Sequence, residues 1–146
     1  MTGAPGGSPF QACRTGRAPC TGFHYTFGRW SGKQVIRTLD PVFPGAPAPP
    51  NDAAQTFSVM ARDGYVVTGL NVDVDDSVRA IQVVFTRGNI NQIDAASQYT
   101  SDWIGIQTGN KVTRLSGNGE FAVGIYGRRG LTLYVVGLLL SKPGGK

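Results

Sequence analysis

The sequence predicts an all-β fold, and three observations support that prediction. Glycine is frequent, at 21 of 146 residues, and 9 prolines add to the number of turn-forming positions. The segments between these positions are rich in Val, Ile, Thr, Phe and Tyr, which favour strands. No window keeps apolar residues at helical spacing over three turns. The length suits one domain, so we expect residues 1–146 to form a single one.

Three segments resemble one another and indicate an internal repeat. Each opens on a glycine followed by an apolar residue, passes through a short polar or glycine-bearing turn, and closes on an apolar strand. They are "CTGFHYTFGRWSGKQVIRTLDPVF" (20–43), "VTGLNVDVDDSVRAIQVVF" (67–85) and "VGIYGRRGLTLYVVGLLL" (123–140), with anchor glycines Gly22, Gly69 and Gly124. The spacing of these glycines leaves room for about four strands per unit.

We therefore predict three four-stranded antiparallel sheets related by an approximate threefold axis. Unit 1 covers about 8–43, a proline-rich connection covers 44–52, unit 2 covers about 55–87, and unit 3 covers about 95–141. "DG" at Asp63-Gly64 and "GNG" at 117–119 are typical of hairpin turns leading into the repeats. The apolar run "GLTLYVVGLLL" (130–140) is expected to be the most buried strand of unit 3, covered on both faces.

Charge and hydropathy narrow the classes of partner. The net charge of +5 is spread along the chain, and only "GRRG" (127–130) places two arginines side by side. A nucleic-acid groove needs clustered Lys and Arg interleaved with aromatics, so we expect no nucleic-acid partner. No stretch reaches the roughly 20 apolar residues of a membrane helix. The start, "MTGAPGGSPF", lacks a signal-peptide pattern, so the chain is either cytoplasmic or already trimmed.

The two cysteines allow two interpretations. Cys13 and Cys20 flank "RTGRAP", and if that segment is a turn between paired strands, the thiols could form a disulfide. The alternative is two separate small buried residues in a reducing compartment. Two Cys and one His cannot supply four soft metal ligands, and we expect neither a metal nor a cofactor.

The glycine-rich start "GAPGGSPF", the strand "DDSVRAIQVVF" and the closing segment "VGIYGRRGLTLYVVGLLL" together resemble the jacalin-related lectins. That family forms a β-prism of three Greek-key sheets, and Gly6-Gly7-Ser8-Pro9-Phe10 is similar to the glycine pair near its N-terminus. The similarity covers about residues 3–140. A looser similarity links the chain to the vitelline-membrane outer-layer protein, another three-sheet prism. The resemblance implies a carbohydrate-binding module.

The resemblance also locates a ligand site, with altered chemistry. In sugar-binding members, a Gly and, four positions later, an Asp enter the last strand of a unit, and the carboxylate accepts hydrogen bonds from two sugar hydroxyls. Aligning the closing strands puts Tyr134, Arg79 and Arg37 at the Asp position of the three units. We therefore expect glycan recognition that differs from the family's usual mode.

The expected ligand site is the apex where the loops of the N-terminal and closing segments meet. The residues assigned to it are Gly6, Gly7, Ser8, Arg128, Arg129, Gly130, Leu131, Thr132 and Tyr134. The two arginines could pair with sulfate, carboxylate or phosphate groups of an acidic glycan. The alternative is a solvated turn whose charges serve solubility. Tyr99, Trp103 and Trp30 are further candidates, as rings that stack on a sugar.

The alternative function is a structural or assembly module that uses the prism for protein contacts, which would allow a homo-oligomer. Either function suits a secreted or cell-surface protein. We expect no enzyme: His24 is the only histidine, no motif marks Ser and Asp partners for it, and Glu120 is the only glutamate.

Overall fold

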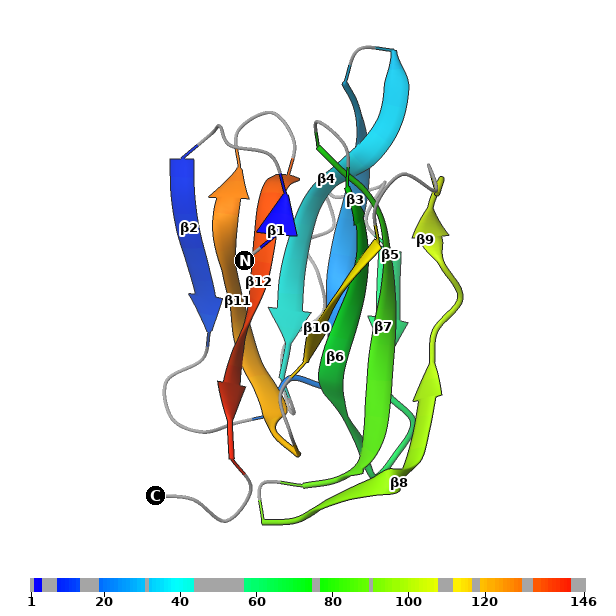
Figure 1. Cartoon of the computed structure of the whole chain (residues 1–146), viewed down its shortest axis with the longest axis vertical. Coiled ribbons are helices and arrows are strands. Elements are labelled where there is room, and N and C mark those ends of the chain that lie inside the picture. The colour runs from blue at the N-terminus through cyan, green and yellow to red at the C-terminus, as the bar shows by residue number, and fades with distance from the viewer. Residues whose placement is uncertain are drawn as a thin grey trace.

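The computed structural model describes residues 2–3, 8–13, 19–30, 32–43, 57–74, 77–89, 91–107, 112–116, 119–129 and 133–142. The regular secondary structure within these ranges consists of β-strands, which confirms the all-β prediction (Figure 1). In the same ranges, no helix is long and apolar enough to cross a membrane. The predicted proline-rich connection, 44–52, lies outside the described residues.

The strands form three antiparallel sheets. The first sheet has the order β1 (Thr2–Gly3), β12 (Leu133–Ser141), β11 (Phe121–Arg129), β2 (Ser8–Cys13). The second sheet has the order β4 (Lys33–Val42), β3 (Gly22–Trp30), β5 (Phe57–Met60). The third sheet has the order β10 (Val112–Ser116), β6 (Tyr65–Val74), β7 (Val78–Gly88), β8 (Ile93–Thr100), and β9 (Ile104–Gly105) also pairs with β7.

Each predicted repeat corresponds to one long hairpin, and each sheet contains one of them. The hairpins are β3–β4, β6–β7 and β11–β12. All three turn at the same end of the molecule, which we call the upper end, as drawn in Figure 1. The opposite end is the lower end. Gly69 and Gly124 occupy equivalent places, opposite Val84 and Leu139, whereas Gly22 lies opposite Val42 in a longer hairpin.

Close packing of a third strand requires the glycine at position 22 and makes position 69 tight. A Cβ on Gly22 would lie 2.3 Å from the carbonyl oxygen of Val59 in β5. A Cβ on Gly69 would lie 3.1 Å from the carbonyl oxygen of Leu115 in β10. The first distance is far below van der Waals contact, so the repeated glycine lets an outer strand approach its hairpin closely.

The outer strands do not follow the predicted unit boundaries. β2, expected in unit 1, pairs with β11 in the first sheet, and β8 and β10, expected in unit 3, belong to the third sheet. The described sheets have four, three and five strands, where four each were expected. Asp63-Gly64 does form a tight turn, with Gly64 at φ +83°, but it joins β5 and β6 of two different sheets. A repeat pattern reveals hairpins, whereas outer-strand pairing depends on contacts distant in the sequence.

The core lies between the three sheets and receives side chains from each. The fully or almost fully buried members include Phe23, Ile36 and Leu39 of the second sheet, Leu70, Ile81 and Phe85 of the third, and Ile125, Leu133 and Val136 of the first. One shared core enclosed by three sheets is the arrangement that an approximate threefold prism requires. Burial of this apolar surface is the main force that holds the sheets together.

The apolar run near the C-terminus is less buried than predicted. β12 does lie inside its sheet, and Leu133 and Val136 are fully buried, but Leu138, Leu139 and Leu140 are only half-buried. The pairing with β1 stops at Val136, so within the described chain the lower half of β12 has a strand on one side only. β7 is the strand whose side chains are buried along nearly its whole length, since β6 flanks one edge and β8 and β9 the other.

A short segment before β3 connects all three sheets at the lower end. The Cys20 amide donates to Ala122 of β11 at 2.7 Å, and the Cys20 carbonyl accepts from Val67 of β6 at 2.9 Å. The Thr21 amide donates to Val42 of β4 at 2.7 Å. Cys20 itself is a free, fully buried cysteine whose thiol donates to the Gly22 carbonyl at 3.1 Å. The burial of Cys20 suits the alternative of a separate buried residue, but the Cys13 side chain lies outside the described residues, so the bridge between them stays a prediction.

Candidate functional site

The upper end of the first sheet gathers the strand ends that lead into the predicted site. Gly3 pairs with Val135 in β12, and Ser8 pairs with Arg129 in β11. Gly3, Ser8, Arg129 and Leu133 therefore lie at the same end of the first sheet. Gly6, Gly7, Gly130, Leu131 and Thr132 lie outside the described residues, and the backbone alone is described for Ser8, Arg129 and Tyr134. Arg128 is half-buried at the end of β11.

Three further cations lie on the neighbouring β3–β4 hairpin. Arg29 and Lys33 are exposed beside its turn, and Arg37 is exposed further along β4. The Arg29 guanidinium donates one hydrogen bond to the Gly32 carbonyl at 3.3 Å. The sequence interpretation missed this group because its members are separated in the chain. The alternation of β3 and β4 about a shared turn was the signal that could have found it.

The two arginines aligned with the family's Asp position are engaged in contacts within the protein. Arg79 is only 6% exposed, and its Nε donates to the Gln34 carbonyl of β4 at 3.1 Å. It thus joins the third sheet to the second near the upper end. The Arg37 side chain lies against Gly28, where a Cβ would be 3.2 Å from that of Arg37. Neither position offers a carboxylate to a sugar, as the alignment indicated.

The aromatic candidates are largely occupied by other contacts. The Tyr99 ring stacks on Phe85 and meets Tyr65 edge-on, both with centroids 5.1 Å away. The guanidinium carbon of Arg62 lies 4.2 Å from the same ring's centroid, and the Tyr99 hydroxyl accepts from the Arg62 amide at 2.8 Å. Both faces of Tyr99 are therefore covered by protein. Trp103 is half-buried, and the Trp30 side chain lies outside the described residues.

His24 has partners that no sequence motif indicated. Its Nδ1 lies 2.6 Å from the Ser58 hydroxyl, and in register it stands between Ser58 of β5 and Asp40 of β4. Ser58, His24 and Asp40 therefore form a row across the outer face of the second sheet. A nucleophile and its base usually act inside a concave pocket, and the polar pocket described next is lined by other residues. Within the described chain, no group of three His, Cys, Asp or Glu side chains could hold a metal ion.

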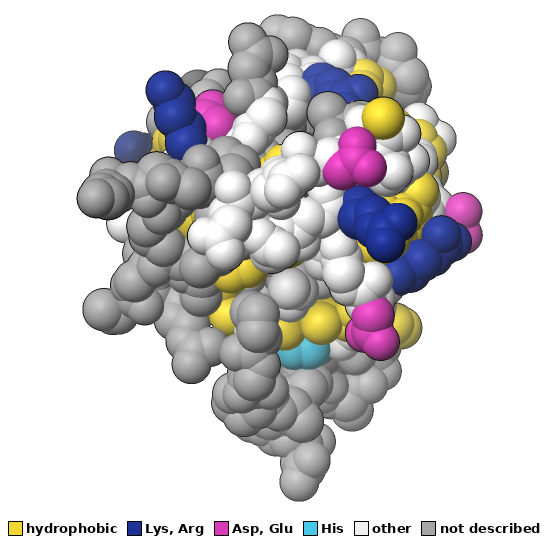
Figure 2. All heavy atoms as spheres, turned by 90° about the horizontal axis from the view of Figure 1, so that it is seen from below, with side chains coloured by type: hydrophobic (Ala, Val, Ile, Leu, Met, Phe, Trp, Pro, Cys, Tyr) yellow, Lys and Arg dark blue, Asp and Glu magenta, His cyan; other side chains and the backbone are white. Residues whose placement is uncertain are grey.

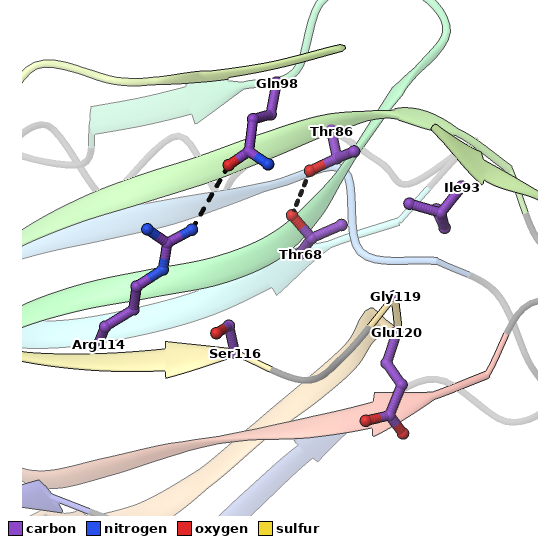
Figure 3. Close-up of a pocket in the computed structure, with 8 residues that line it drawn as sticks. All are labelled: Thr68, Thr86, Ile93, Gln98, Arg114, Ser116, Gly119 and Glu120. Carbon is purple, nitrogen blue, oxygen red and sulfur yellow. Dashed lines mark hydrogen bonds between the residues drawn. The ribbon is translucent and has the colours of Figure 1, made fainter. Parts of the chain in front are cut away.

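A polar pocket opens on the outer face of the third sheet, towards the lower end (Figure 3). Its volume is about 90 Å³, and its lining is Thr68, Thr86, Ile93, Gln98, Arg114, Ser116, Gly119 and Glu120. The Thr68 and Thr86 hydroxyls lie 2.6 Å apart. Arg114 of β10 donates to Gln98 of β8 at 3.4 Å, above the two central strands (Figure 3). The sequence interpretation did not find this pocket.

The lower end has a mixed surface charge. Figure 2 looks at this end and shows Lys and Arg side chains interleaved with Asp and Glu along one side, with polar groups and backbone in between. Unlike the cations of the β3–β4 hairpin, these charges largely compensate one another. The two ends of the molecule therefore differ in the ligands that their charges favour.

Comparison with known proteins supports one fold. No protein-family model matches the chain, and no curated protein sequence matches it. Among solved structures, a prostate-specific WGA16 glycoprotein lectin is similar with a TM-score of 0.69 and 14% identity, over 98% of this chain and 96% of that one. An artocarpin–mannotriose complex gives 0.63 and 15%, over 96% and 93%. Calystegia sepium agglutinin gives 0.61 and 14%, over 97% and 93%. The chain therefore has the β-prism fold of the jacalin-related lectins.

Proposed function

We propose that the chain is a carbohydrate-binding module whose ligand site is the upper end of the first sheet. The fold is shared, over nearly the whole chain, with proteins described as lectins, one of them in complex with mannotriose. The observation that carries the proposal is the pairing of Ser8 with Arg129 beside that of Gly3 with Val135. These pairs put Gly3, Ser8 and Arg129, the described residues nearest to the predicted apex, at one end of one sheet, which supports the proposal.

The ligand that suits this end is an acidic glycan. Arg128 is the last residue but one of β11, and Arg29 and Lys33 are exposed beside the turn of the next hairpin, at the same end (Figure 1). A guanidinium can donate two parallel hydrogen bonds to a sulfate or carboxylate, and such charge-assisted bonds are about twice as strong as neutral ones. The protein would then donate hydrogen bonds to anionic groups of the ligand. In the family's usual mode, a carboxylate of the protein accepts hydrogen bonds from sugar hydroxyls.

The test is a glycan array with sulfated, carboxylated and neutral glycans, probed with the wild type and two double variants. Arg128→Ala with Arg129→Ala should weaken binding to acidic glycans by roughly thirtyfold, since each of the two lost charge-assisted bonds contributes about 1 kcal/mol. Arg62→Ala with Arg87→Ala is the matched control. It removes the same charge from the lower end and should leave binding unchanged.

An equal loss in both double variants would contradict a local site. No binding to any glycan, together with a mass that rises with protein concentration, would favour the assembly alternative. One observation supports that alternative: β5, an edge strand of the described second sheet, exposes Phe57 at 45% and Met60 at 47%. Neither function involves catalysis.

A further inference from the structure

We propose that the polar pocket at the lower end of the third sheet is a second ligand site, and that it takes a small neutral polyol such as the hydroxyl-bearing edge of one sugar ring. The site goes beyond the proposed function, because it lies at the opposite end of the prism from the apex. Nothing in the sequence repeat or the family resemblance points to it.

The floor of the pocket is a pair of hydroxyls held on two neighbouring strands. Thr68 of β6 and Thr86 of β7 are 9% and 3% exposed, and their hydroxyls lie 2.6 Å apart. Whichever hydroxyl donates, the other keeps its proton, and both oxygens keep acceptor lone pairs. Both residues stand on the two central strands of a sheet, which fixes their positions before a ligand arrives.

The walls add both donors and acceptors. The guanidinium of Arg114 can only donate, while Ser116 and Gln98 both donate and accept. Glu120 adds an acceptor at the rim, where its carboxylate points away from the threonine pair (Figure 3). Figure 3 shows Arg114 and Gln98 meeting on one side of the threonine pair, Ser116 below the pair on the same strand as Arg114, and the Gly119–Glu120 corner on the other side. A sugar or glycerol carries adjacent hydroxyls that both donate and accept, so its chemistry complements this lining.

Charge and size select the class of ligand. One cation, Arg114, and one anion, Glu120, line the pocket, so it gives no net attraction to an anion or a cation. The volume of about 90 Å³ holds about three water molecules, at about 30 Å³ each. That space suits two or three hydroxyl-bearing carbons of a ring. Ile93 is the one large apolar side chain in the lining, and it can cover the C–H face of the ligand.

The test is an NMR titration of the ¹⁵N-labelled chain with three probes: methyl α-D-glucoside, methyl α-D-galactoside and glycerol. At least one probe should shift the amides of Thr68, Thr86 and Gln98 in a saturable way. The decisive variant is Thr68→Val with Thr86→Val. It replaces both hydroxyls by groups of the same shape, so no buried partner is left unsatisfied, and binding should weaken about tenfold.

The chain offers a matched control for this variant. Thr26 and Thr38 form the same kind of hydroxyl pair, 2.7 Å apart, on the second sheet. Thr26→Val with Thr38→Val should leave the affinity unchanged. No saturable shift at the pocket with any probe would overturn the second site, as would equal weakening by both variants. Shifts confined to Arg128 and its neighbours would also overturn it, while leaving the apex proposal intact.

Discussion

The upper end of the prism presents exposed cations on strands β3 and β4, beside the turn that joins them, whereas the lower end presents a small pocket lined by four strands and one corner. Arg29 and Lys33 stand in solvent at the first, and the charges of Arg114 and Glu120 compensate each other at the second. The ends are also held together differently. At the upper end, the buried side chain of Arg79 joins two sheets. At the lower end, backbone hydrogen bonds of Cys20 and Thr21 join three sheets. One fold thus offers two chemically distinct surfaces.

The difference teaches where such a fold can change its ligand. A hairpin turn can alter in composition without disturbing the core, because the apolar contacts lie in the strands. The lower pocket depends on the register of β6 with β7, of β7 with β8 and of β6 with β10. A one-residue slip in any of them would turn its lining away, so this site is tied to the fold itself.

The largest expected effect is a difference in stability between two substitutions, Arg79→Ala at the upper end and Arg114→Ala at the lower end. Arg79→Ala should lower the free energy of unfolding by about 3 kcal/mol, because it leaves a cavity and an unsatisfied Gln34 carbonyl between two sheets. Arg114→Ala removes an exposed side chain with one long hydrogen bond, and should change stability by less than about 0.5 kcal/mol. Urea unfolding measures both. Equal losses of unfolding free energy in the two variants would show that Arg79 does not hold the two sheets together.

The second expected effect concerns pH and the lower junction. Burial raises the pKa of the Cys20 thiol from 9.0 to about 12, although its hydrogen bond to Gly22 opposes the shift. Between these values the unfolded chain binds fewer protons than the folded one. The free energy of unfolding therefore falls as pH rises through this window, by at most about 1.4 kcal/mol per pH unit. Below pH 9 the contribution is fully present.

Cys20→Ala isolates this effect. Urea unfolding of the wild type and the variant near pH 8 and near pH 10 gives the difference, which cancels the titration of lysines and tyrosines. The wild type should lose more stability than the variant over that interval. Parallel losses would mean that the thiol is not shielded from water, and rapid alkylation of Cys20 in the folded chain at pH 8 would show the same.

The smallest expected effect is a difference in salt dependence between the ends. Binding of an acidic glycan at the upper end should weaken roughly tenfold between about 0.05 M and about 0.5 M salt, since exposed ion pairs are screened. Binding of a neutral methyl glycoside at the lower pocket should hardly change. Calorimetric titration at both salt concentrations measures this. A neutral probe with the same steep dependence would remove the distinction between the two sites.

The sequence predicts some parts of this molecule better than others, for physical reasons. The three hairpins are visible because their strands are adjacent in the chain and because Gly22, and less strictly Gly69, lies against a neighbouring strand. The partner of β2 is not visible, since it pairs with β11 at the far end of the chain. In the sequence, nothing distinguishes Thr68 and Thr86 from other strand residues. Only the strand register in the structure shows that they share a pocket with side chains from β8 and β10.

The measurement that tests the account most directly is a pair of NMR titrations on one labelled sample, one with a sulfated disaccharide and one with a neutral methyl glycoside. The account predicts that the sulfated sugar shifts the amides of Lys33 and Arg128 at the upper end, and that the neutral sugar shifts those of Thr86 and Gln98 at the lower end. Shifts at one common end for both ligands, or none for either, would contradict it.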